Sequence, residues 1–288
     1  PYRTIDLVED GSITQKMSSP AMSQSAHMNA PSENKPLIGI SAALVYIAIM
    51  GVGMIYLTSQ GITYGSPEMF EPFWPILIVL NIVNIFVAMR FFGWRNAGFG
   101  RLDAKQLIWF LPFLVLLAYK WYVSLGAMSA FPADSANWRT FAFFGFVTLL
   151  IGTGEELAFR GILLHSFLGR QSSRTRVALA MLVSAVGFAL LHSVNYFGGE
   201  SLPEMLRQLV YTFRWGMVFA PLMLRLKNII PLMIVHWLWD FVQFSTLISE
   251  DVAIVAHDYL QAPIEIVTGL VLWYLVLKDV GKQDMAKA

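Results

Sequence analysis

Two adjacent glutamates lie in a stretch of chain whose composition is that of a membrane span. Glu155 and Glu156 follow an apolar run at 141–150 and precede another at 161–164, and Arg160 comes one helical turn later. A carboxylate placed in hydrocarbon costs on the order of 3 kcal/mol on insertion scales. Because two such groups are retained side by side, we expect them to serve the function of the protein.

Other polar side chains lie deep in apolar stretches of the chain. They are Lys120, His192, Arg214, His236 and Asp240. His236 and Asp240 are four residues apart, so they share one face of a helix, as do Glu156 and Arg160. Glu155 is rotated by about 100° from Glu156. We expect Glu155, His192, His236 and Asp240 to converge on a single cavity.

This set of residues suits the activation of water. A carboxylate and an imidazole can hold a water molecule and remove its proton as it attacks a carbonyl. A second imidazole with a polar neighbour can stabilise the resulting oxyanion. The glycines at 152 and 154 leave room beside Glu155 for a substrate or a water molecule.

Four residues have a simpler structural interpretation. We expect Glu156 and Arg160 to form a supporting ion pair, and Phe188, one turn before His192, to be a packing residue. Arg214 is too deep to reach the interface easily, so we expect it to neutralise an acidic group. Lys120 is closer to a span end, where a long side chain can extend to the interface.

Composition places the chain among polytopic membrane proteins. Of its 288 residues, 56% are hydrophobic and 14% are charged, whereas soluble domains have about 25% charged residues. The absence of cysteine excludes disulfides, thiol catalysis and zinc sites with cysteine ligands. There is no basic patch with interleaved aromatic residues, so we do not expect nucleic acid to bind.

Hydropathy predicts an all-α bundle of about eight transmembrane helices. The spans are 37–58, 73–92, 107–127, 138–167, 177–196, 205–225, 229–248 and 263–277. The loops between them alternate between basic and acidic. The basic set carries Arg90, Arg95, Arg101, Lys105, Arg170, Arg174, Arg176, Arg225, Lys227, Lys278, Lys282 and Lys287. The alternate loops, 59–72, 128–137, 197–206 and 249–262, contain no Lys or Arg. Since basic loops stay in the cytoplasm, both termini are predicted to be cytoplasmic.

The chain divides into four segments by composition. Residues 1–35 are polar and predicted to be disordered, and they lack the apolar core of a signal peptide. Residues 36–137 hold the first three spans, 138–248 hold the polar residues described above, and 249–288 hold the last span and a cytoplasmic tail.

Three motifs in this chain resemble those of the CPBP family, the intramembrane proteases related to CAAX prenyl endopeptidases. They are Glu155-Glu156-x-x-x-Arg160, Phe188-x-x-x-His192 and His236-x-x-x-Asp240. The resemblance implies an eight-helix endopeptidase with its site open toward the cytoplasm. It also implies that Glu155 and His192 activate water, that His236 and residue 240 form the oxyanion site, and that no cofactor is needed.

The chain departs from the eukaryotic-like members of that family at Asp240, where they have Asn. Ionised Asp cannot donate a hydrogen bond, so Asp240 either carries a proton or accepts a hydrogen bond from His236. Bacterial members often have this form, which points to a bacterial plasma membrane. The expected partners are membrane lipids, a peptide or membrane-protein substrate, and a larger membrane complex.

Other functions remain open from the sequence. Glu155, His192, His236 and Asp240 could together bind zinc, although no His-Glu-x-x-His spacing is present. Gly152-x-Gly154-Glu155 superficially resembles the loop of aspartyl intramembrane proteases, but no partner Asp motif precedes it. A non-catalytic scaffold, a bacteriocin-immunity protein or a proton-coupled transporter could also retain buried carboxylates.

Overall fold

A computed structural model describes residues 35–128, 136–169, 172–245 and 258–285 of the chain. The predicted disorder of the N-terminal segment concerns residues outside this described part, apart from Lys35. Eight long helices are described: α1 (Pro36–Ser59), α2 (Phe70–Val87), α3 (Leu111–Met128), α4 (Ala136–Glu156), α6 (Arg174–Leu191), α7 (Leu202–Leu226), α8 (Ile230–Ser245) and α9 (Asp258–Met285).

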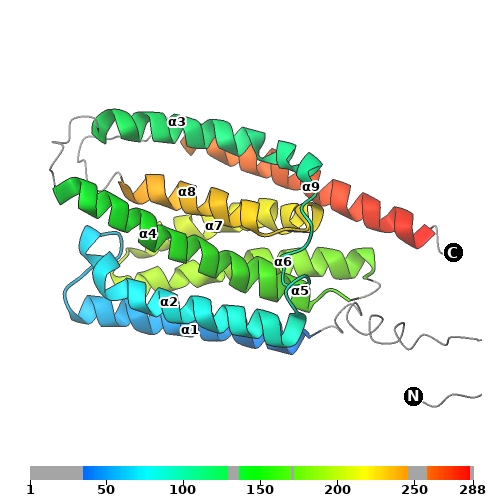
Figure 1. The fold of residues 1–288 in the computed structure, drawn as a ribbon, viewed down its shortest axis with the longest axis horizontal. Coiled ribbons are helices and arrows are strands. Elements are labelled where there is room, and N and C mark those ends of the chain that lie inside the picture. The colour runs from blue at the N-terminus through cyan, green and yellow to red at the C-terminus, as the bar shows by residue number, and fades with distance from the viewer. Residues whose placement is uncertain (1–34, 129–135, 170–171, 246–257, 286–288) are drawn as a thin grey trace, which may run out of the picture. The chain divides into compact units, whose positions relative to one another are not determined.

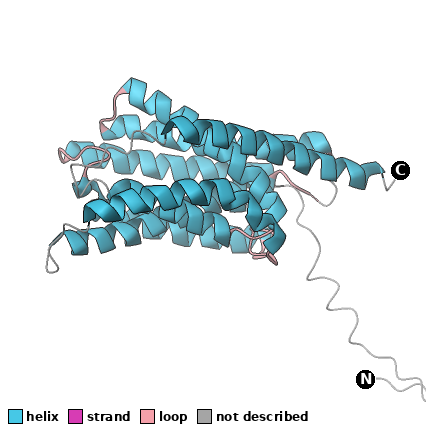
Figure 2. Cartoon of the chain, turned by 90° about the horizontal axis from the view of Figure 1, so that it is seen from above, coloured by secondary structure: helices cyan, strands magenta, loops and turns pink. Residues whose placement is uncertain are grey.

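Shorter helical segments extend or connect these helices. They are η3 (Pro67–Met69), η4 (Ala88–Phe92), η5 (Ala104–Phe110), η6 (Leu157–Leu163), α5 (Leu164–Ser166) and η7 (His192–Gly198). Within the described ranges the only β-type contact is an isolated bridge between Phe99 and Asn228. The fold is therefore all-α, as predicted, and Figures 1 and 2 show the helices running side by side.

Six helical segments of the described chain are long and apolar enough to cross a membrane. They are Pro36–Ser59, Pro67–Phe92, Ala104–Gly126, Ala136–Ser166, Arg174–Gly198 and Leu260–Lys282. The described part of α8 has 16 residues, and α7 carries Arg214 and Arg225, which lower its hydropathy. The chain is a polytopic membrane protein, and a count of eight spans remains a prediction for α7 and α8.

Hydrogen bonds tie the loops together at two opposite ends of the helices. At one end, the backbone N–H of Tyr64 donates to Gly198 (2.7 Å) and the Thr58 hydroxyl donates to the Phe197 carbonyl (2.6 Å). We call residues 59–72 and 197–206 the acidic end, on the left in Figure 1.

The other end is held in the same way. Asp103 N–H donates to the Leu226 carbonyl (2.9 Å), and Lys35 donates to the carbonyls of Ser166 (2.8 Å) and Phe91 (2.7 Å). We call residues 90–105, 172–176, 225–229 and 278–282 the basic end. The predicted alternation of the loops is thus reproduced in space for the described residues.

Glycines bring the site-bearing helices close together. A Cβ at Gly152 of α4 would lie 2.9 Å from the backbone N of Trp237 on α8, and one at Gly216 of α7 would lie 2.6 Å from the Ala185 Cα on α6. Small residues allow such approach between membrane helices. As a result, the end of α4 lies directly against the turn of α8 that carries His236.

Candidate functional site

The first motif occupies the junction of α4 with the π-helical segment η6. Glu155 and Glu156 are the last residues of α4, and Arg160 lies in η6. The predicted ion pair is present: Arg160 Nη1 lies 2.9 Å from Glu156 Oε1, and both side chains are fully buried. Short π-helical segments inside helices are frequent at functional sites.

His236 lies among three carboxylates. Its Nδ1 donates to Glu156 Oε1 at 2.8 Å, while its Nε2 lies 3.4 Å from Asp240 Oδ2 and 3.8 Å from Glu155 Oε2. The helical spacing predicted only the pair of Glu156 with Arg160. The structure adds that Glu156 Oε1, the oxygen that contacts Arg160, also accepts from His236. The 3.4 Å contact leaves both predicted states of Asp240 open: a protonated Asp240 donates to Nε2 of a neutral His236, and an ionised Asp240 accepts from a doubly protonated one.

His192 follows directly on the last residue of α6. Its Nδ1 lies 2.9 Å from the Phe188 carbonyl, and because a carbonyl only accepts, Nδ1 carries the proton. In the neutral ring Nε2 is then an acceptor, which suits a group that binds or deprotonates water. The helical i,i+4 spacing of the second motif therefore fixes the tautomer of its histidine.

Phe188 packs between the functional side chains. Its ring centroid lies 5.1 Å from that of His192 and 5.8 Å from that of His236, and the Arg160 guanidinium lies 4.0 Å from it. Phe188 is therefore a packing residue, as predicted. The side chains packed against its ring, His192, His236 and Arg160, belong to the site.

Arg214 has the acidic partner that was predicted for it. Its Nε lies 2.7 Å from Glu265 Oε2, and the Glu265 side chain is fully buried. Gln261 donates to the other oxygen of Glu265 at 2.6 Å. Glu265 was not predicted as this partner. It is an acidic residue inside the predicted span at 263–277, and that position was a signal that it pairs with a buried cation.

Lys120 does not extend to the interface, so that prediction is wrong. The residue is 2% exposed, its ammonium donates to Gln243 Oε1 at 3.0 Å, and it lies 4.2 Å from the ring centroid of Trp239. The amide and the aromatic face, both on α8, replace water around the charge. Hydropathy within α3 alone could not reveal this partner helix.

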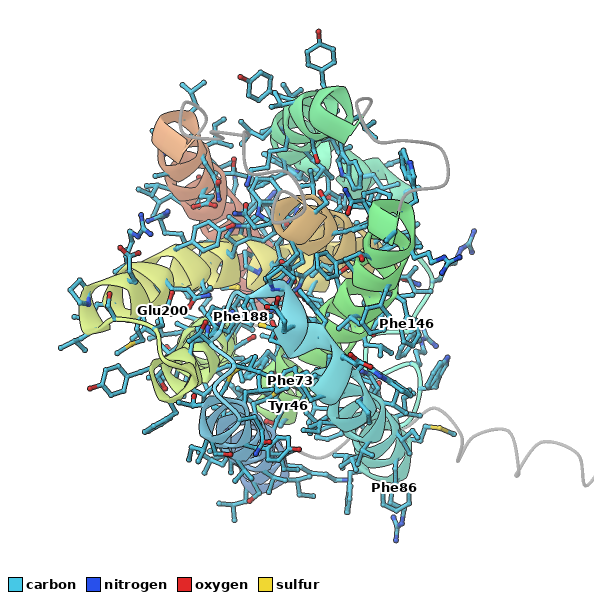
Figure 3. The ribbon with its side chains drawn as sticks, turned by 90° about the vertical axis from the view of Figure 1, so that its left-hand side faces the viewer. Tyr46, Phe73, Phe86, Phe146, Phe188 and Glu200 are labelled. Atoms are coloured by element: carbon cyan, nitrogen blue, oxygen red, sulfur yellow. The ribbon has the colours of Figure 1, made fainter. Side chains whose placement is uncertain are left out.

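A cavity of about 760 Å³ joins the four predicted catalytic residues. Glu155, His192, His236 and Asp240 all line it, together with Phe188, Lys120 and Arg214. Glu155 Oε2 is buried and has no hydrogen-bond partner among the described residues. Figure 3, seen from the acidic end, labels Phe188 and Glu200, and both residues line the cavity.

The cavity reaches the acidic end of the helices. Its outer lining includes Tyr64, Glu200, Glu204 and Arg207, and no described residue of the basic end lines it. Partial burial and the neighbouring Glu204 raise the pKa of the Glu200 carboxyl above its ordinary value. Two predictions therefore exclude each other, because the cavity opens at the end opposite to the basic loops. If the basic loops lie in the cytoplasm, the site does not open toward the cytoplasm.

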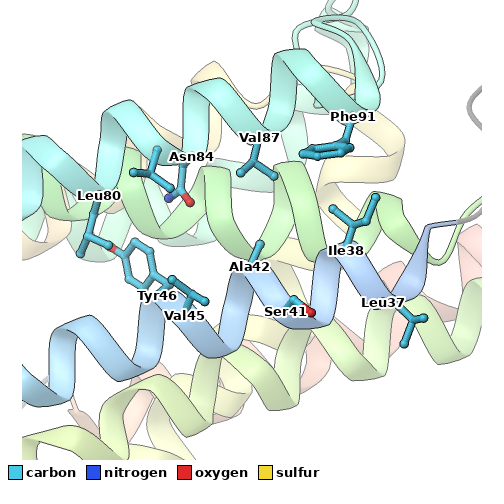
Figure 4. A pocket seen from close by; sticks show the side chains of 11 residues that line it. Leu37, Ile38, Ser41, Ala42, Val45, Tyr46, Leu80, Asn84, Val87 and Phe91 are labelled. Carbon is cyan, nitrogen blue, oxygen red and sulfur yellow. The ribbon is translucent and has the colours of Figure 1, made fainter.

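A second, smaller cavity of about 350 Å³ lies between α1 and α2 (Figure 4). Its lining is mostly apolar, with Ser41, Tyr46 and Asn84 as the polar members. Asn84 donates to the Gly154 carbonyl at 3.0 Å. This cavity contains none of the predicted catalytic residues. The hydrogen bond from Asn84 in its wall helps to hold the end of α4 in place.

In the described part of the chain, no group of three or more His, Asp or Glu side chains is arranged to hold a metal ion. The zinc-dependent alternative thus gains no support from the donor geometry. Independence from metals and cofactors stays a prediction, to be tested with the purified protein.

Comparison with known proteins agrees with the motifs. A family model described as Type II CAAX prenyl endopeptidase Rce1-like matches residues 137–242, which contain all four predicted catalytic residues. A search of curated proteins found no match. The match covers α4 to α8 and leaves α1 to α3 and α9 outside. The three motifs and the matched residues therefore coincide, and residues 137–242 of this polytopic membrane protein are similar to an Rce1-like domain.

Proposed function

We propose that this protein is a glutamate-type intramembrane endopeptidase that hydrolyses a peptide bond with water activated by Glu155 and His192. The match of residues 137–242 to a family model of endopeptidases supports a hydrolase. The observation that carries the proposal is the buried Glu155 carboxylate, which lines the same cavity as His192. Its Oε2 has no hydrogen-bond partner among the described residues and lies 3.8 Å from His236 Nε2.

The first step uses the two acceptors that line the cavity. The Glu155 carboxylate accepts one proton of the bound water, and the unprotonated Nε2 of His192 accepts a hydrogen bond from its other hydrogen. The remaining hydroxide attacks the substrate carbonyl carbon and forms a tetrahedral intermediate. The cavity has ample room, since a water molecule takes up about 30 Å³ in the liquid.

The second step needs a donor for the oxyanion. His236 supplies it when both ring nitrogens are protonated, because Nδ1 is held by Glu156 and Nε2 faces the cavity beside Asp240. Glu155 then passes its proton to the leaving nitrogen, and the C–N bond breaks to give a carboxylic acid and an amine. The acid transfers its proton to the amine, and a carboxylate and an ammonium leave. Arg160 holds Glu156 in place.

The test is a Glu155→Gln variant, which keeps the shape of the side chain but cannot accept the proton. General-base catalysis contributes about 10²–10⁴-fold, so cleavage should fall by at least about 100-fold. The measurement is a comparison of protein termini in membranes from cells producing either form. Glu71→Gln, at an exposed carboxylate on α2, is the matched control and should cleave normally.

Normal cleavage by Glu155→Gln would refute the mechanism. Equal terminus profiles for wild type and Glu155→Gln, with one large complex co-purifying, would favour the scaffold function instead. Chelators should leave the wild-type rate unchanged, and a loss restored by zinc would favour the metalloprotease alternative.

A further inference from the structure

The route by which water and substrate reach Glu155 can be followed through the lining of the cavity. From Glu155 and His236 the wall continues through Tyr211 and Gln208 to Glu204 and Arg207. The side chain of Arg207 is 77% exposed and that of Glu204 is 47% exposed. The cavity thus passes from fully enclosed carboxylates to solvent-exposed residues at the acidic end.

The opposite direction is closed by packed side chains. Arg160, Phe159 and Phe219 are fully buried and lie beneath the site, and Ile162 and Leu226, closer to the basic end, are also fully buried. Native interiors of this kind are close-packed and contain few voids larger than a water molecule. Among the described residues, none of the basic end lines the cavity that contains Glu155.

Helix lengths place His192 nearer the acidic end, whereas Glu155 and His236 lie nearer the basic ends of their own helices, so the direction of the cavity rests on its lining. Gly198, which is hydrogen-bonded to Tyr64 at the acidic end, comes six positions after His192, a distance of about 12 Å at the 3₁₀ rise. The 18 residues of α6 separate His192 from the basic end, about 27 Å at the α-helical rise.

The charges of the two ends indicate which side of the membrane each one faces. The described part of the basic end carries Arg90, Arg95, Arg101, Lys105, Arg174, Arg176, Arg225, Lys227, Lys278 and Lys282. Residues 59–72 and 197–206 contain no Lys or Arg, and the basic residues at this end are Arg139 and Arg207, at the edges of the loops. Lys and Arg in short loops are retained in the cytoplasm, so the acidic end faces the other side.

We infer that the catalytic cavity is entered from the non-cytoplasmic face of the membrane, and that its substrates are peptides or membrane-protein segments exposed on that face. The substrate class rests on the proposed function, whereas the side of the entrance does not. It replaces the expectation of a cytoplasmic entrance, because the loop charges and the cavity lining are independent observations that agree.

The natural absence of cysteine makes a direct test possible. Three variants each carry a single thiol: Thr63→Cys in an exposed loop of the acidic end, Ala104→Cys at the basic end, and Thr212→Cys in the cavity wall. The Thr212 hydroxyl bonds only to carbonyls of its own helix among the described residues, so a thiol is a mild replacement. The probe is a charged methanethiosulfonate that does not cross membranes.

In intact cells and right-side-out vesicles, Thr63→Cys and Thr212→Cys should react with the probe, and Ala104→Cys should react only in inside-out vesicles. Modification of Ala104→Cys but not Thr63→Cys in intact cells would overturn the orientation. If the thiol at 212 reacts only in inside-out vesicles, or from neither side, the inferred entrance on the non-cytoplasmic face is wrong.

A second readout separates this inference from the proposed function. Adding Glu155→Gln to Thr212→Cys should leave labelling unchanged, because labelling requires access and not catalysis. If the labelling pattern holds while no cleavage is found, the entrance stands and the protease function fails. If cleavage occurs, the external probe should block it in Thr212→Cys and leave it unaffected in Thr63→Cys.

Discussion

Glu156 is the residue on which the site depends structurally. Its Oε1 accepts from both Arg160 Nη1 and His236 Nδ1, and no water-exposed surface remains on either Glu156 or Arg160. The first contact follows from helical spacing and could be predicted. The second joins residues 80 positions apart, and it depends on how closely α4 and α8 pack, which no local pattern specifies.

Removing this carboxylate should destabilise the protein. Glu156→Ala leaves the buried Arg160 without its partner, and breaking a buried pair in this way costs about 3–5 kcal/mol. Glu156→Gln keeps an oxygen for His236 and should lower the unfolding temperature by less. Thermal unfolding in detergent measures both, and Glu156→Ala/Arg160→Met should recover part of the loss. Equal unfolding temperatures for Glu156→Ala and wild type would contradict this role.

Asp240 gives a second prediction at the scale of single residues. Its Oδ2 lies 3.4 Å from His236 Nε2, and an asparagine of the same shape keeps an accepting oxygen and adds a donor for the oxyanion. Asp240→Asn should therefore keep at least about a tenth of the cleavage rate. Asp240→Leu, which can neither accept from His236 nor donate to the oxyanion, should lose about 100-fold or more, the range found when an oxyanion-stabilising group is removed.

The two Asp240 variants must be compared as correctly folded proteins, with the unfolding temperature as the control. If Asp240→Asn is as inactive as Asp240→Leu, the negative charge itself is required, and the assigned contact to His236 is insufficient.

At the scale of helices, the apolar stretches and the loop charges predicted the elements well. The exceptions have local causes. The 3₁₀ segment after α6 and the π-helical segment after α4 arise where the chain adapts to its neighbours, and hydropathy does not record such adaptations. The buried position of Lys120 required knowledge of the neighbouring α8, which supplies Gln243 and Trp239.

Close contact of α4 and α8 at Gly152 leads to a prediction for the element that positions His236. In Gly152→Ala the new methyl would meet the backbone N of Trp237 at 2.9 Å, so α8 must move. Overpacking of this kind costs about 1–3 kcal/mol, and the shift should also reduce cleavage.

Gly269→Ala is the matched control for Gly152→Ala, since its Cβ would meet its nearest atom, the Met217 carbonyl oxygen, at 3.5 Å, an ordinary contact. Unfolding temperature and cleavage rate are measured for both variants. A Gly152→Ala protein that matches Gly269→Ala in both would show that α8 tolerates displacement.

At the scale of the whole molecule, two predictions made from the sequence turned out to exclude each other. The positions of basic loops and the direction of the site were inferred separately, one from charge and the other from resemblance. Only the three-dimensional lining of the cavity relates them, because it shows which loops surround the entrance. The structure thus changes the side of the membrane on which the proposed reaction would occur.

The size of the cavity also bears on the state of the chain that reaches Glu155. A volume of about 760 Å³ is that of a site for a small ligand, so a folded domain cannot enter. An intact substrate helix exposes no free carbonyl, because its backbone groups are already hydrogen-bonded. The bond to be cut must first unwind, and unwound backbone in lipid costs several kcal/mol per unsatisfied group. Gln208, Gln243 and Gln261 line the cavity wall and could supply replacement hydrogen bonds by exchanging their present partners, Asn195, Lys120 and Glu265. The enzyme would then select substrate segments by how easily they unwind. Helix-breaking residues near the cleaved peptide bond would affect cleavage as much as the side chains on either side of that bond.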